Sequence, residues 1–460
     1  MGKIRLAVTM VGVGALVWMA AFLVPLTSHG TDTQPGRLGA VLIGKCGAPS
    51  GDLARVDWLV YRFGRTGKYP YGVIPAAGGG FASVFGPGPA WLGAPFMQSL
   101  PDPPRTFRDD RGIRRRARQA AALAFALAAA LMVLAAAATT DLKHAALTGL
   151  VCAFSFSGVA ILAQALWQQT AMLPCFAGAL AALAWQERWS WSTALLPPLI
   201  VVAVLVRPVI APIALGLGIV WLDRLRAAPR ANAGKVLAGV LLALLAALPF
   251  LAWNLRYLGT SLPVGQLRTG ADADMFTFAH PLLYLEGLAG ILVSPARGLL
   301  WWAPLALFGI AVALGSDRRD VRILALTLLA NVLFLAGFFK WWGGVGNGPR
   351  LLTETLWLSA WLALALVPRS RPRLLGVAAA ATLFVGVLSS IAYSPMKWEV
   401  PANVDQHPER LWNVVDSPLV AMLSAQPIMA AMDGWKGPFQ CKDGRLVTIP
   451  EDSMGVGWFY

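Results

Sequence analysis

Long apolar runs separated by short polar segments dominate the hydrophobic pattern of this chain. Eleven such runs can be counted, most of them close to the ~20 residues that an α-helix needs to cross a bilayer. They cover residues 6–26, 119–138, 145–165, 170–186, 192–207, 208–223, 235–253, 298–316, 321–339, 351–367 and 374–393. The pattern predicts an all-α polytopic membrane protein with about 11 transmembrane helices.

The stretch 192–223 decides this count. It is interrupted by Arg207-Pro208, so it is either one long tilted helix or a pair of short ones. The connections 223–235, 316–322 and 368–373 are rich in arginine, as cytoplasmic loops are. Two helices place all three connections inside the cell, with the N-terminus cytoplasmic and the C-terminus outside.

Composition agrees with a membrane protein. Of 460 residues, 57% are hydrophobic and 13% are charged, whereas soluble proteins carry about 25% charged residues. This excludes a soluble cytosolic enzyme. The net charge of +15 arises mostly from the arginine-rich connections, so it predicts membrane topology and no nucleic-acid partner.

The polar mass of the chain lies in three stretches, all on the predicted outer side. They are a first outer loop (27–118), a second large outer loop (254–297) and a C-terminal extension (394–460) that follows a transmembrane module (1–393). Extramembrane mass on one face favours an enzyme acting at the outer membrane surface over a transporter. Cys46 and Cys441 both fall on this side, where a disulfide between them is allowed.

Five arginines before the second apolar run conflict with the charge rule, because they lie on the predicted outer side. They are Arg111, Arg114, Arg115, Arg116 and Arg118. They are either a local exception to a statistical rule or a basic collar for the headgroups of anionic membrane lipids.

Asp52 is the first candidate for chemistry. It opens a short segment, 50–59, which predicts an amphipathic helix with Leu53, Val56, Leu59 and Val60 on one side. A carboxylate at a helix N-terminus is either an N-cap or a group available for chemistry.

Charged residues near the predicted helix ends form the second group of candidates. Arg350 follows a glycine-rich loop and is spaced i,i+4 from Glu354, so the two form an intrahelical ion pair or a guanidinium that holds a phosphate and is oriented by the glutamate. Arg207 lies in or near hydrocarbon and Arg297 at a milder depth. Such charges require an anionic partner from the protein or from a ligand.

Several segments, taken in order, resemble one family. They are 50–59, 85–96, 165–168, 206–208, 254–265, 294–300 and 342–354, with 405–418 also similar. Together they resemble the bacterial multispanning glycosyltransferases of the GT-C fold, in the group of the protein mannosyltransferases and the lipid A aminoarabinose transferase. The resemblance implies a GT-C-like fold with amphipathic helices in the outer loops.

The resemblance also implies an activity. Such enzymes transfer a sugar from a polyprenyl-phosphate-linked donor to an envelope acceptor (lipid, glycan or protein), usually with inversion, at the outer face of the cytoplasmic membrane. Asp52 matches their acidic residue of the first outer loop, which accepts the acceptor's proton or helps to hold the acceptor or a divalent cation such as Mg²⁺ or Mn²⁺. The residues implied for binding the donor phosphate and substrate are Arg350, Glu354, Arg297, Arg207 and Asn254.

This chain departs from the family pattern at several points, among them Val345 and Asn347, where relatives tend to have aromatic residues. No second acidic residue lies beside Asp52, and Gln169 stands where relatives often have histidine. Two other functions therefore stay open: a flippase or transporter of lipid-linked glycans, and a non-catalytic membrane subunit of an envelope-assembly complex. A flippase is expected to show internal repeats, and the sequence has no clear repeat.

Overall fold

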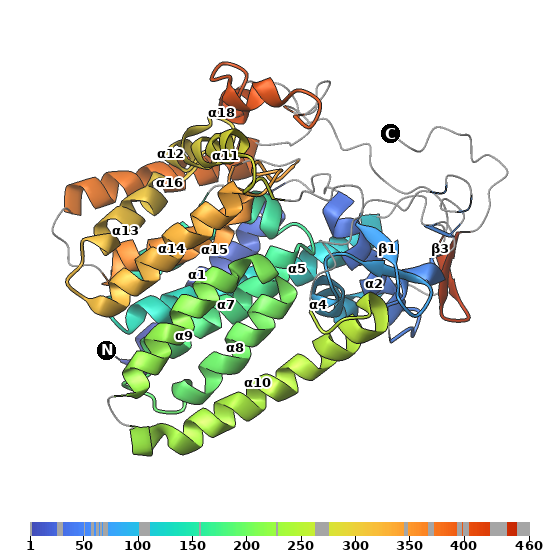
Figure 1. Ribbon diagram of the computed structural model, residues 1–460, viewed down its shortest axis with the longest axis horizontal. Coiled ribbons are helices and arrows are strands. Elements are labelled where there is room, and N and C mark those ends of the chain that lie inside the picture. Colours follow the sequence, from blue (N-terminus) through green and yellow to red (C-terminus); the bar gives the residue numbers. More distant parts are fainter. Residues whose placement is uncertain are drawn as a thin grey trace.

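The computed structural model describes most of the chain. The described residues are 2–24, 31–49, 51–56, 59–60, 64, 67, 72–100, 111–155, 158–226, 229–262, 276–344, 348–366, 372–392, 398, 404–423 and 439–448. Helices make up nearly all of the regular structure, accompanied by two small antiparallel hairpins (Figure 1). This confirms the predicted all-α class.

Most helices follow the apolar runs in order. The α-helices are α1 (Lys3–Leu23), α2 (Gln34–Gly44), α4 (Gly88–Met97), α5 (Arg111–Ala137), α6 (Leu142–Phe154), α7 (Gln168–Ala184), α8 (Ser192–Val206), α9 (Ala211–Leu225), α10 (Pro229–Leu258), α11 (Pro281–Val293), α12 (Leu299–Trp302), α13 (Pro304–Leu314), α14 (Arg319–Ala336), α15 (Thr353–Trp361), α16 (Pro372–Ala392) and α18 (Pro418–Leu423). Short helical turns include η1 (Thr31–Thr33), η2 (Leu53–Arg55), η3 (Gly158–Leu162), η4 (Pro208–Ile210), η6 (Arg350–Leu352), η7 (Leu362–Leu366) and η8 (Pro408–Trp412). The strands are β1 (Val73–Pro75), β2 (Phe81–Ser83), β3 (Phe439–Lys442) and β4 (Arg445–Thr448). Of the α-helices, α2, α4, α11 and α18 lie in the predicted outer stretches.

Among the described helices, five are long and apolar enough to cross a membrane: Lys3–Leu23, Gly112–Ala137, Pro208–Leu225, Asn232–Leu258 and Arg373–Ala392. The protein is therefore a membrane-embedded helical protein, but the helices do not reproduce eleven full-length spans. Several predicted runs are divided between shorter helical pieces. The run 145–165 is shared by α6 and the π-turn η3, and the run 298–316 is divided into α12 and α13 at Ala303.

The stretch 192–223 forms two helices. α8 ends at Arg207, whose φ of −142° and ψ of 90° lie outside the helical region, and Pro208 starts the short turn η4 that leads into α9. Proline cannot donate a backbone hydrogen bond and restricts the residue before it, so the chain breaks here. The two-helix interpretation is confirmed.

The long helices lie side by side as a bundle, with small residues where they approach closely (Figure 1). A Cβ added to Gly309 of α13 would lie 2.5 Å from the carbonyl oxygen of Ser359 in α15. On α5, Ala121, Ala128 and Ala129 are fully buried. Small side chains let membrane helices pack backbone to backbone, which compensates for the weak hydrophobic driving force between helices in lipid.

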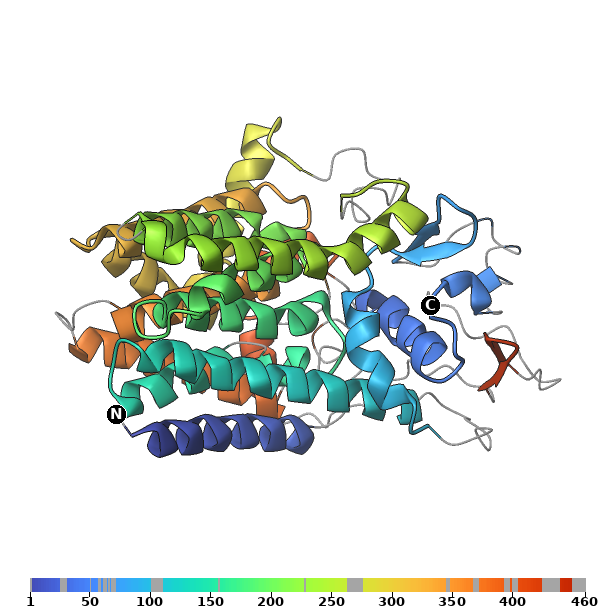
Figure 2. The same cartoon turned by 90° about the horizontal axis from the view of Figure 1, so that it is seen from below.

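The first outer loop and the C-terminal hairpin gather at one end of the bundle. Helices α2 and α4 and both hairpins lie opposite the end that carries the N-terminus (Figures 1 and 2). A disulfide joins Cys46, just after α2, to Cys441 in β3, which confirms that these cysteines meet. An isolated bridge between Val56 and Leu446 also places the β3–β4 hairpin beside η2.

The arginine cluster of 111–118 is largely structural. Arg118 is 8% exposed and donates from Nη2 to the carbonyl of Val24 at 2.5 Å and, from Nε and Nη2, to that of Ala21. These carbonyls end α1, where a cation offsets the partial negative charge of the helix. Arg116 contacts Gln119, and Arg115 is exposed. The interpretation of all five arginines as a lipid-binding collar is therefore wrong. Arg114 and Arg118 are buried and cannot contact lipid headgroups.

Candidate functional site

An ion pair joins the first outer loop to the start of α15. Asp32 lies in η1, directly before α2, and its Oδ2 accepts a hydrogen bond of 2.7 Å from Nη2 of Arg350. Arg350 Nε donates to the carbonyl of Gly343 at 2.7 Å, and the guanidinium carbon lies 4.6 Å from the ring centre of Trp167. Arg350 is thus fixed by a carboxylate, a backbone carbonyl and an aromatic face.

A second ion pair lies beside the first. Arg207 and Glu354 form a salt bridge with side-chain exposures of 5% and 0%, and Arg207 Nη2 also donates to the carbonyl of Leu351 at 3.0 Å. Arg350 is close enough for its charge to repel that of Arg207. The sequence predicted an anionic partner for Arg207, and Glu354 supplies it.

The expected pairing of Arg350 with Glu354 is not what the described contacts show. Glu354 contacts Arg207, which lies 147 residues earlier, and Arg350 contacts Asp32, 318 residues away. Glu354 is fully buried, and a buried carboxylate needs an oppositely charged partner, which Arg207 supplies from another helix. Glu354 therefore orients Arg207, not Arg350.

The ends of several helices converge on these two ion pairs. A Cβ added to Gly36 of α2 would lie 2.9 Å from Pro89 of α4 and 3.4 Å from the carbonyl oxygen of Leu166. One added to Gly88 would lie 2.9 Å from Val206, the residue before Arg207. The family-like segments 85–96, 165–168, 206–208 and 342–354 therefore meet at one place, although they are far apart in sequence.

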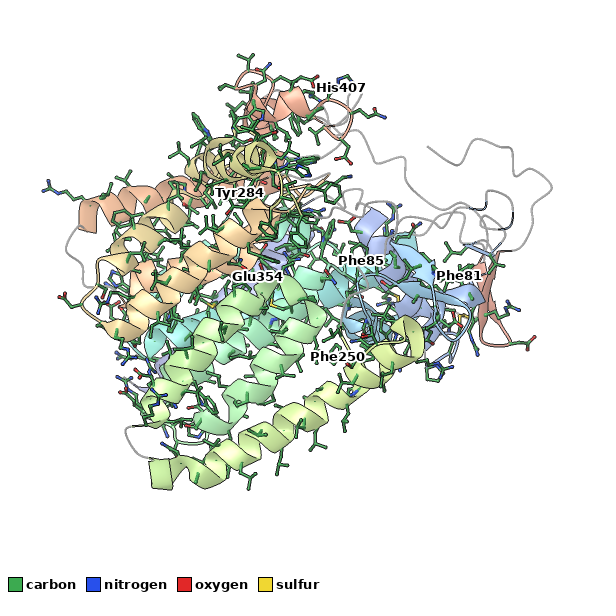
Figure 3. All side chains as sticks on the ribbon, in the orientation of Figure 1. Phe81, Phe85, Phe250, Tyr284, Glu354 and His407 are labelled. Atoms are coloured by element: carbon green, nitrogen blue, oxygen red, sulfur yellow. A yellow bond between two sulfur atoms is a disulfide. The ribbon has the colours of Figure 1, made fainter. Side chains whose placement is uncertain are left out.

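Figure 3 labels one residue of the buried ion pair, Glu354, and one residue of the first outer loop, Phe85. Glu354 lies within the bundle, and Phe85 lies on the side of the first outer loop. The carbonyl of Phe85 accepts a hydrogen bond of 2.9 Å from Nε2 of Gln168, the first residue of α7. The start of α7 is thereby fixed to the first outer loop.

Arg297 holds the glycine-rich loop. It is 1% exposed, and its guanidinium donates to the carbonyls of Trp342 at 3.0 Å and Gly344 at 3.2 Å. It also lies 5.1 Å from the ring centre of Trp398 in the C-terminal extension. These contacts make Arg297 a positioning residue for the loop that carries Arg350.

Asn254 has a local contact. It is 3% exposed in the last turns of α10, and its Nδ2 donates to the carbonyl of Ser261 at 3.2 Å. Three residues later, the carbonyl of Tyr257 accepts from the backbone of Ala77 next to β1. Asn254 therefore orders the chain after α10, and no described contact joins it to either ion pair.

Asp52 is an N-cap. Its Oδ1 accepts from the backbone N–H of Ala54 at 2.9 Å and from that of Phe81 at 3.1 Å. A Cβ at Gly80, which has φ +93°, would lie 2.7 Å from Asp52 Oδ2, so only glycine lets the β1–β2 turn approach this closely. Asp52 therefore connects η2 to β2.

The segment that Asp52 opens matches its predicted amphipathic pattern in part. Leu53, Val56 and Leu59 are buried as expected, whereas Val60 is 39% exposed. Residues 50, 57 and 58 of the expected segment lie outside the described residues.

Asp52 and Asp32 are separated along α2. Gly51 packs against Gly39, where an added Cβ would lie 3.8 Å from the Gly39 Cα. Gly39 follows Asp32 by seven residues, about 10 Å of helical rise. Among the described contacts, none joins Asp52 to Arg350, Arg207 or Arg297.

The sequence interpretation missed Asp32. It is the one acidic residue between the first apolar run and Asp52, and it directly precedes a helix that starts Gln34-Pro35. An acidic residue before a proline-marked helix start was a usable signal. Its partner was not visible because Arg350 is 318 residues away.

The described residues do not assemble a metal-binding set. In the part of the chain that the structure describes, no three His, Cys, Asp or Glu side chains lie close enough to hold a metal ion. Asp52, the residue considered for a divalent cation, uses Oδ1 to accept two backbone hydrogen bonds. Within the described residues, Asp52 is therefore not joined by other carboxylates or histidines in a metal-binding set.

Comparison with known proteins adds no relative: no family model, no curated protein and no solved structure matches this chain. The functional interpretation therefore depends on the geometry of the two ion pairs and on the resemblance of the segments that surround them.

Proposed function

We propose that this protein is a glycosyltransferase that transfers a sugar from a polyprenyl-phosphate-linked donor to an envelope acceptor. One observation carries the proposal: the carboxylate of Asp32 lies against the guanidinium of Arg350, at the end of an apolar helix bundle. Transfer from such a donor needs a base for the acceptor and a cation for the leaving phosphate. Asp32 is the candidate for the base and Arg350 is the candidate for the cation.

The reaction follows from this pair. The Asp32 carboxylate accepts the proton of the acceptor hydroxyl as its oxygen attacks the anomeric carbon. The bond between that carbon and the phosphate oxygen breaks, and the polyprenyl phosphate leaves with the electron pair. Attack from the face opposite the phosphate inverts the anomeric centre. Arg350 stabilises the charge that develops on the phosphate, which is where electrostatic catalysis has its largest effect.

This assignment moves the proposed base from Asp52 to Asp32. Both carboxylates belong to the first outer loop, but only Asp32 has a described contact with a cation of the site. Asp52 keeps a structural role at η2. Arg207 and Glu354 support Arg350 from within the bundle, and Arg297 supports it through the glycine-rich loop. No step is assigned to a metal.

The proposed topology places the N-terminus in the cytoplasm and the C-terminus on the outer side of the bacterial inner membrane. Two observations support it. The N-terminus lies at the end of the bundle opposite α2 and the hairpins (Figure 2). The Cys46–Cys441 disulfide lies at that opposite end and suits an oxidising compartment outside the cytoplasm. The proposed site thus faces the outer side, where the lipid-linked donor and membrane lipids are its partners.

The test compares envelope glycans by mass spectrometry. A strain lacking this protein is complemented with wild type or with Asp32→Asn, which removes the base with little change in volume. We expect one sugar to disappear on deletion and to return only with wild type; the mass difference identifies the sugar. Glycans unchanged by deletion would contradict a transferase and favour the non-catalytic subunit. Loss of whole lipid-linked glycans from the outer face would favour the flippase.

A further inference from the structure

Two guanidinium groups hold the glycine-rich loop that precedes Arg350. Arg297 donates from Nε to the carbonyl of Trp342 at 3.0 Å and from Nη2 to that of Gly344 at 3.2 Å. Between them, the carbonyl of Gly343 accepts from Nε of Arg350 at 2.7 Å. Both glycines have positive φ, 75° and 67°, and have no side chains that could fix the loop. The position of the Arg350 guanidinium therefore depends on a backbone that Arg297 holds.

Arg297 in turn lies against a tryptophan of the C-terminal extension. Its guanidinium carbon lies 5.1 Å from the ring centre of Trp398, and that of Arg410 lies 4.8 Å from the same ring. Trp398 is 2% exposed, and its Nε1 donates to Oδ1 of Asp416 at 3.0 Å. Arg410 donates to Oδ2 of Asp416 at 2.6 Å and to the carbonyl of Trp398 at 2.8 Å. A cation this close to an indole face is attracted to it, and more strongly when both are buried. Trp398 is therefore fixed within the extension and supports Arg297.

The extension also contacts the loop region directly. Asp405 accepts hydrogen bonds of 2.9 Å from Nζ of Lys340 and from Nε1 of Trp342. Ser294, which is fully buried just before the supporting arginine, donates from Oγ to the carbonyl of Leu411 at 2.6 Å. The extension is thus joined both to the residues that precede the glycines and to the turn that holds them. Hydrogen bonds and cation–π contacts depend on direction, whereas apolar packing does not, so these contacts fix a position.

We propose that the C-terminal extension, through Trp398 and Asp405, positions Arg350 for the leaving phosphate. The inference rests on the proposed function and adds two positioning residues to it. Trp398 acts through Arg297, and Asp405 acts through Trp342. An extension that only stabilises the bundle is the alternative, and the experiment separates the two.

The experiment measures sugar transfer by the full chain in nanodiscs, with the donor that the envelope-glycan comparison identifies. The variants are Trp398→Leu, which removes the aromatic face, and Trp398→Phe, which keeps one. Each is made in wild type and in Arg350→Lys. Trp221→Leu is the matched control, because Trp221 is also a buried tryptophan and its Nε1 donates to the carbonyl of Thr193. That carbonyl lies at the start of α8, at the opposite end of the helix from Arg207.

We expect Trp398→Leu to lower kcat about tenfold with KM nearly unchanged, because a displaced Arg350 loses an interaction made only in the transition state. Trp398→Phe should recover most of this loss. In Arg350→Lys, the same leucine change should cost less than about twofold, since the positioned group is already gone. Trp221→Leu should change kcat by the same factor in both backgrounds. An equal loss for Trp398→Leu in both backgrounds would overturn the inference, and so would normal transfer by Trp398→Leu in wild type.

Hydrogen exchange measures the order of the loop without any transfer. The backbone N–H of Gly343 donates to the carbonyl of Lys340 at 2.8 Å, and that of Arg350 donates to the carbonyl of Gly348 at 2.9 Å. Both amides should exchange about tenfold faster in Trp398→Leu than in wild type. In the Trp221 control they should exchange at the wild-type rate.

The two measurements separate this inference from the proposed function. Faster exchange in Trp398→Leu, in a protein whose wild type transfers no sugar, would contradict the transferase and keep the positioning of the loop. Transfer by wild type, with unchanged exchange and unchanged transfer in Trp398→Leu, would contradict the positioning and keep the transferase.

Asp405→Ala decides the question if Trp398→Leu does not fold. Asp405 is 34% exposed, so its removal leaves no cavity in the bundle. Its control is Glu409→Ala, which removes an exposed carboxylate of the same extension that pairs with His407. We expect Asp405→Ala to lower kcat about threefold and Glu409→Ala to match wild type. Wild-type kcat and wild-type exchange in Asp405→Ala would then overturn the inference.

Discussion

The first outer loop carries two carboxylates, Asp32 and Asp52, in opposite environments. Asp32 is paired with the guanidinium of Arg350 where several helix ends meet. Asp52, twenty residues later, accepts from the backbone N–H groups of Ala54 and Phe81. The hydrogen bonds of Asp52 fix local structure, whereas that of Asp32 connects it to the guanidinium of Arg350. The comparison teaches that position in a loop does not identify a base; the partners of the carboxylate do.

Apart from loss of the proposed base itself, the largest effect is expected at Arg350, the cation that contacts Asp32. Arg350→Lys should lower sugar transfer by about 100-fold, because an ammonium cannot contact Asp32, the Gly343 carbonyl and a phosphate in one fixed plane. Arg318→Lys, at a half-exposed surface pair with Asp320, is the matched control and should transfer normally. Full activity of Arg350→Lys would show that transfer does not need the planar guanidinium group of Arg350.

The next effect concerns the buried ion pair that supports this region. Glu354→Gln leaves Arg207 charged and unpaired within the bundle, so stability should fall by about 3–5 kcal/mol. Thermal unfolding in detergent measures the loss as a lower apparent Tm. The double change Arg207→Met with Glu354→Leu should recover most of it, because no charge is then left buried. An unchanged Tm in Glu354→Gln would mean that the pair does not support the fold.

A smaller effect is expected on the Asp52 side. Asp52→Ala removes an N-cap and should lower stability by about 0.5–2 kcal/mol. Asp52→Asn should stay within a few tenths of a kcal/mol of wild type, because asparagine caps as well as aspartate. Chemical denaturation of both variants in the same detergent checks the difference. Equal losses in both would show that the negative charge matters, which the cap alone does not explain.

The smallest effect on transfer is expected at the disulfide. Cys46→Ser with Cys441→Ser should leave transfer near wild type, because the bridge tethers the β3–β4 hairpin to the Asp52 side of the loop. Limited proteolysis should then cut the hairpin faster. Cys152→Ser, at a buried free cysteine, is the control and should not alter that cleavage. A loss of transfer in the double serine variant would show that the β3–β4 hairpin contributes to activity.

Sequence reasoning predicted the features that depend on local pattern. The apolar runs fall on helices, and Arg207-Pro208 breaks one of them. For Asp52 the sequence left two roles open, and the observed one is the N-cap and not the chemistry for which the residue was chosen. Cys46 and Cys441 could be matched because they are the two of the four cysteines that lie in predicted outer stretches. The position of Arg207 within an apolar run predicted an anionic partner, although it did not identify Glu354 as that partner.

The features that depend on tertiary packing could not be predicted. The i,i+4 spacing of Arg350 and Glu354 suggested a pair, but Glu354 turns into the bundle and meets Arg207. Asp32 and Arg350 are 318 residues apart, and no local signal joins them. The number of full spans failed for a related reason: irregular backbone such as that at Ala303 divides an apolar run when neighbouring helices satisfy the freed backbone groups.

The most direct test of this account compares Asp32→Asn with Asp52→Asn in the same transfer assay. Both variants are purified in parallel, checked for equal folding by thermal unfolding, and assayed with the donor that the envelope-glycan comparison identifies. We expect Asp32→Asn to lose at least about 100-fold in turnover, as loss of a general base does, and Asp52→Asn to stay within about twofold of wild type. Normal turnover by Asp32→Asn, or a loss confined to Asp52→Asn, would contradict the assignment of Asp32 as the base.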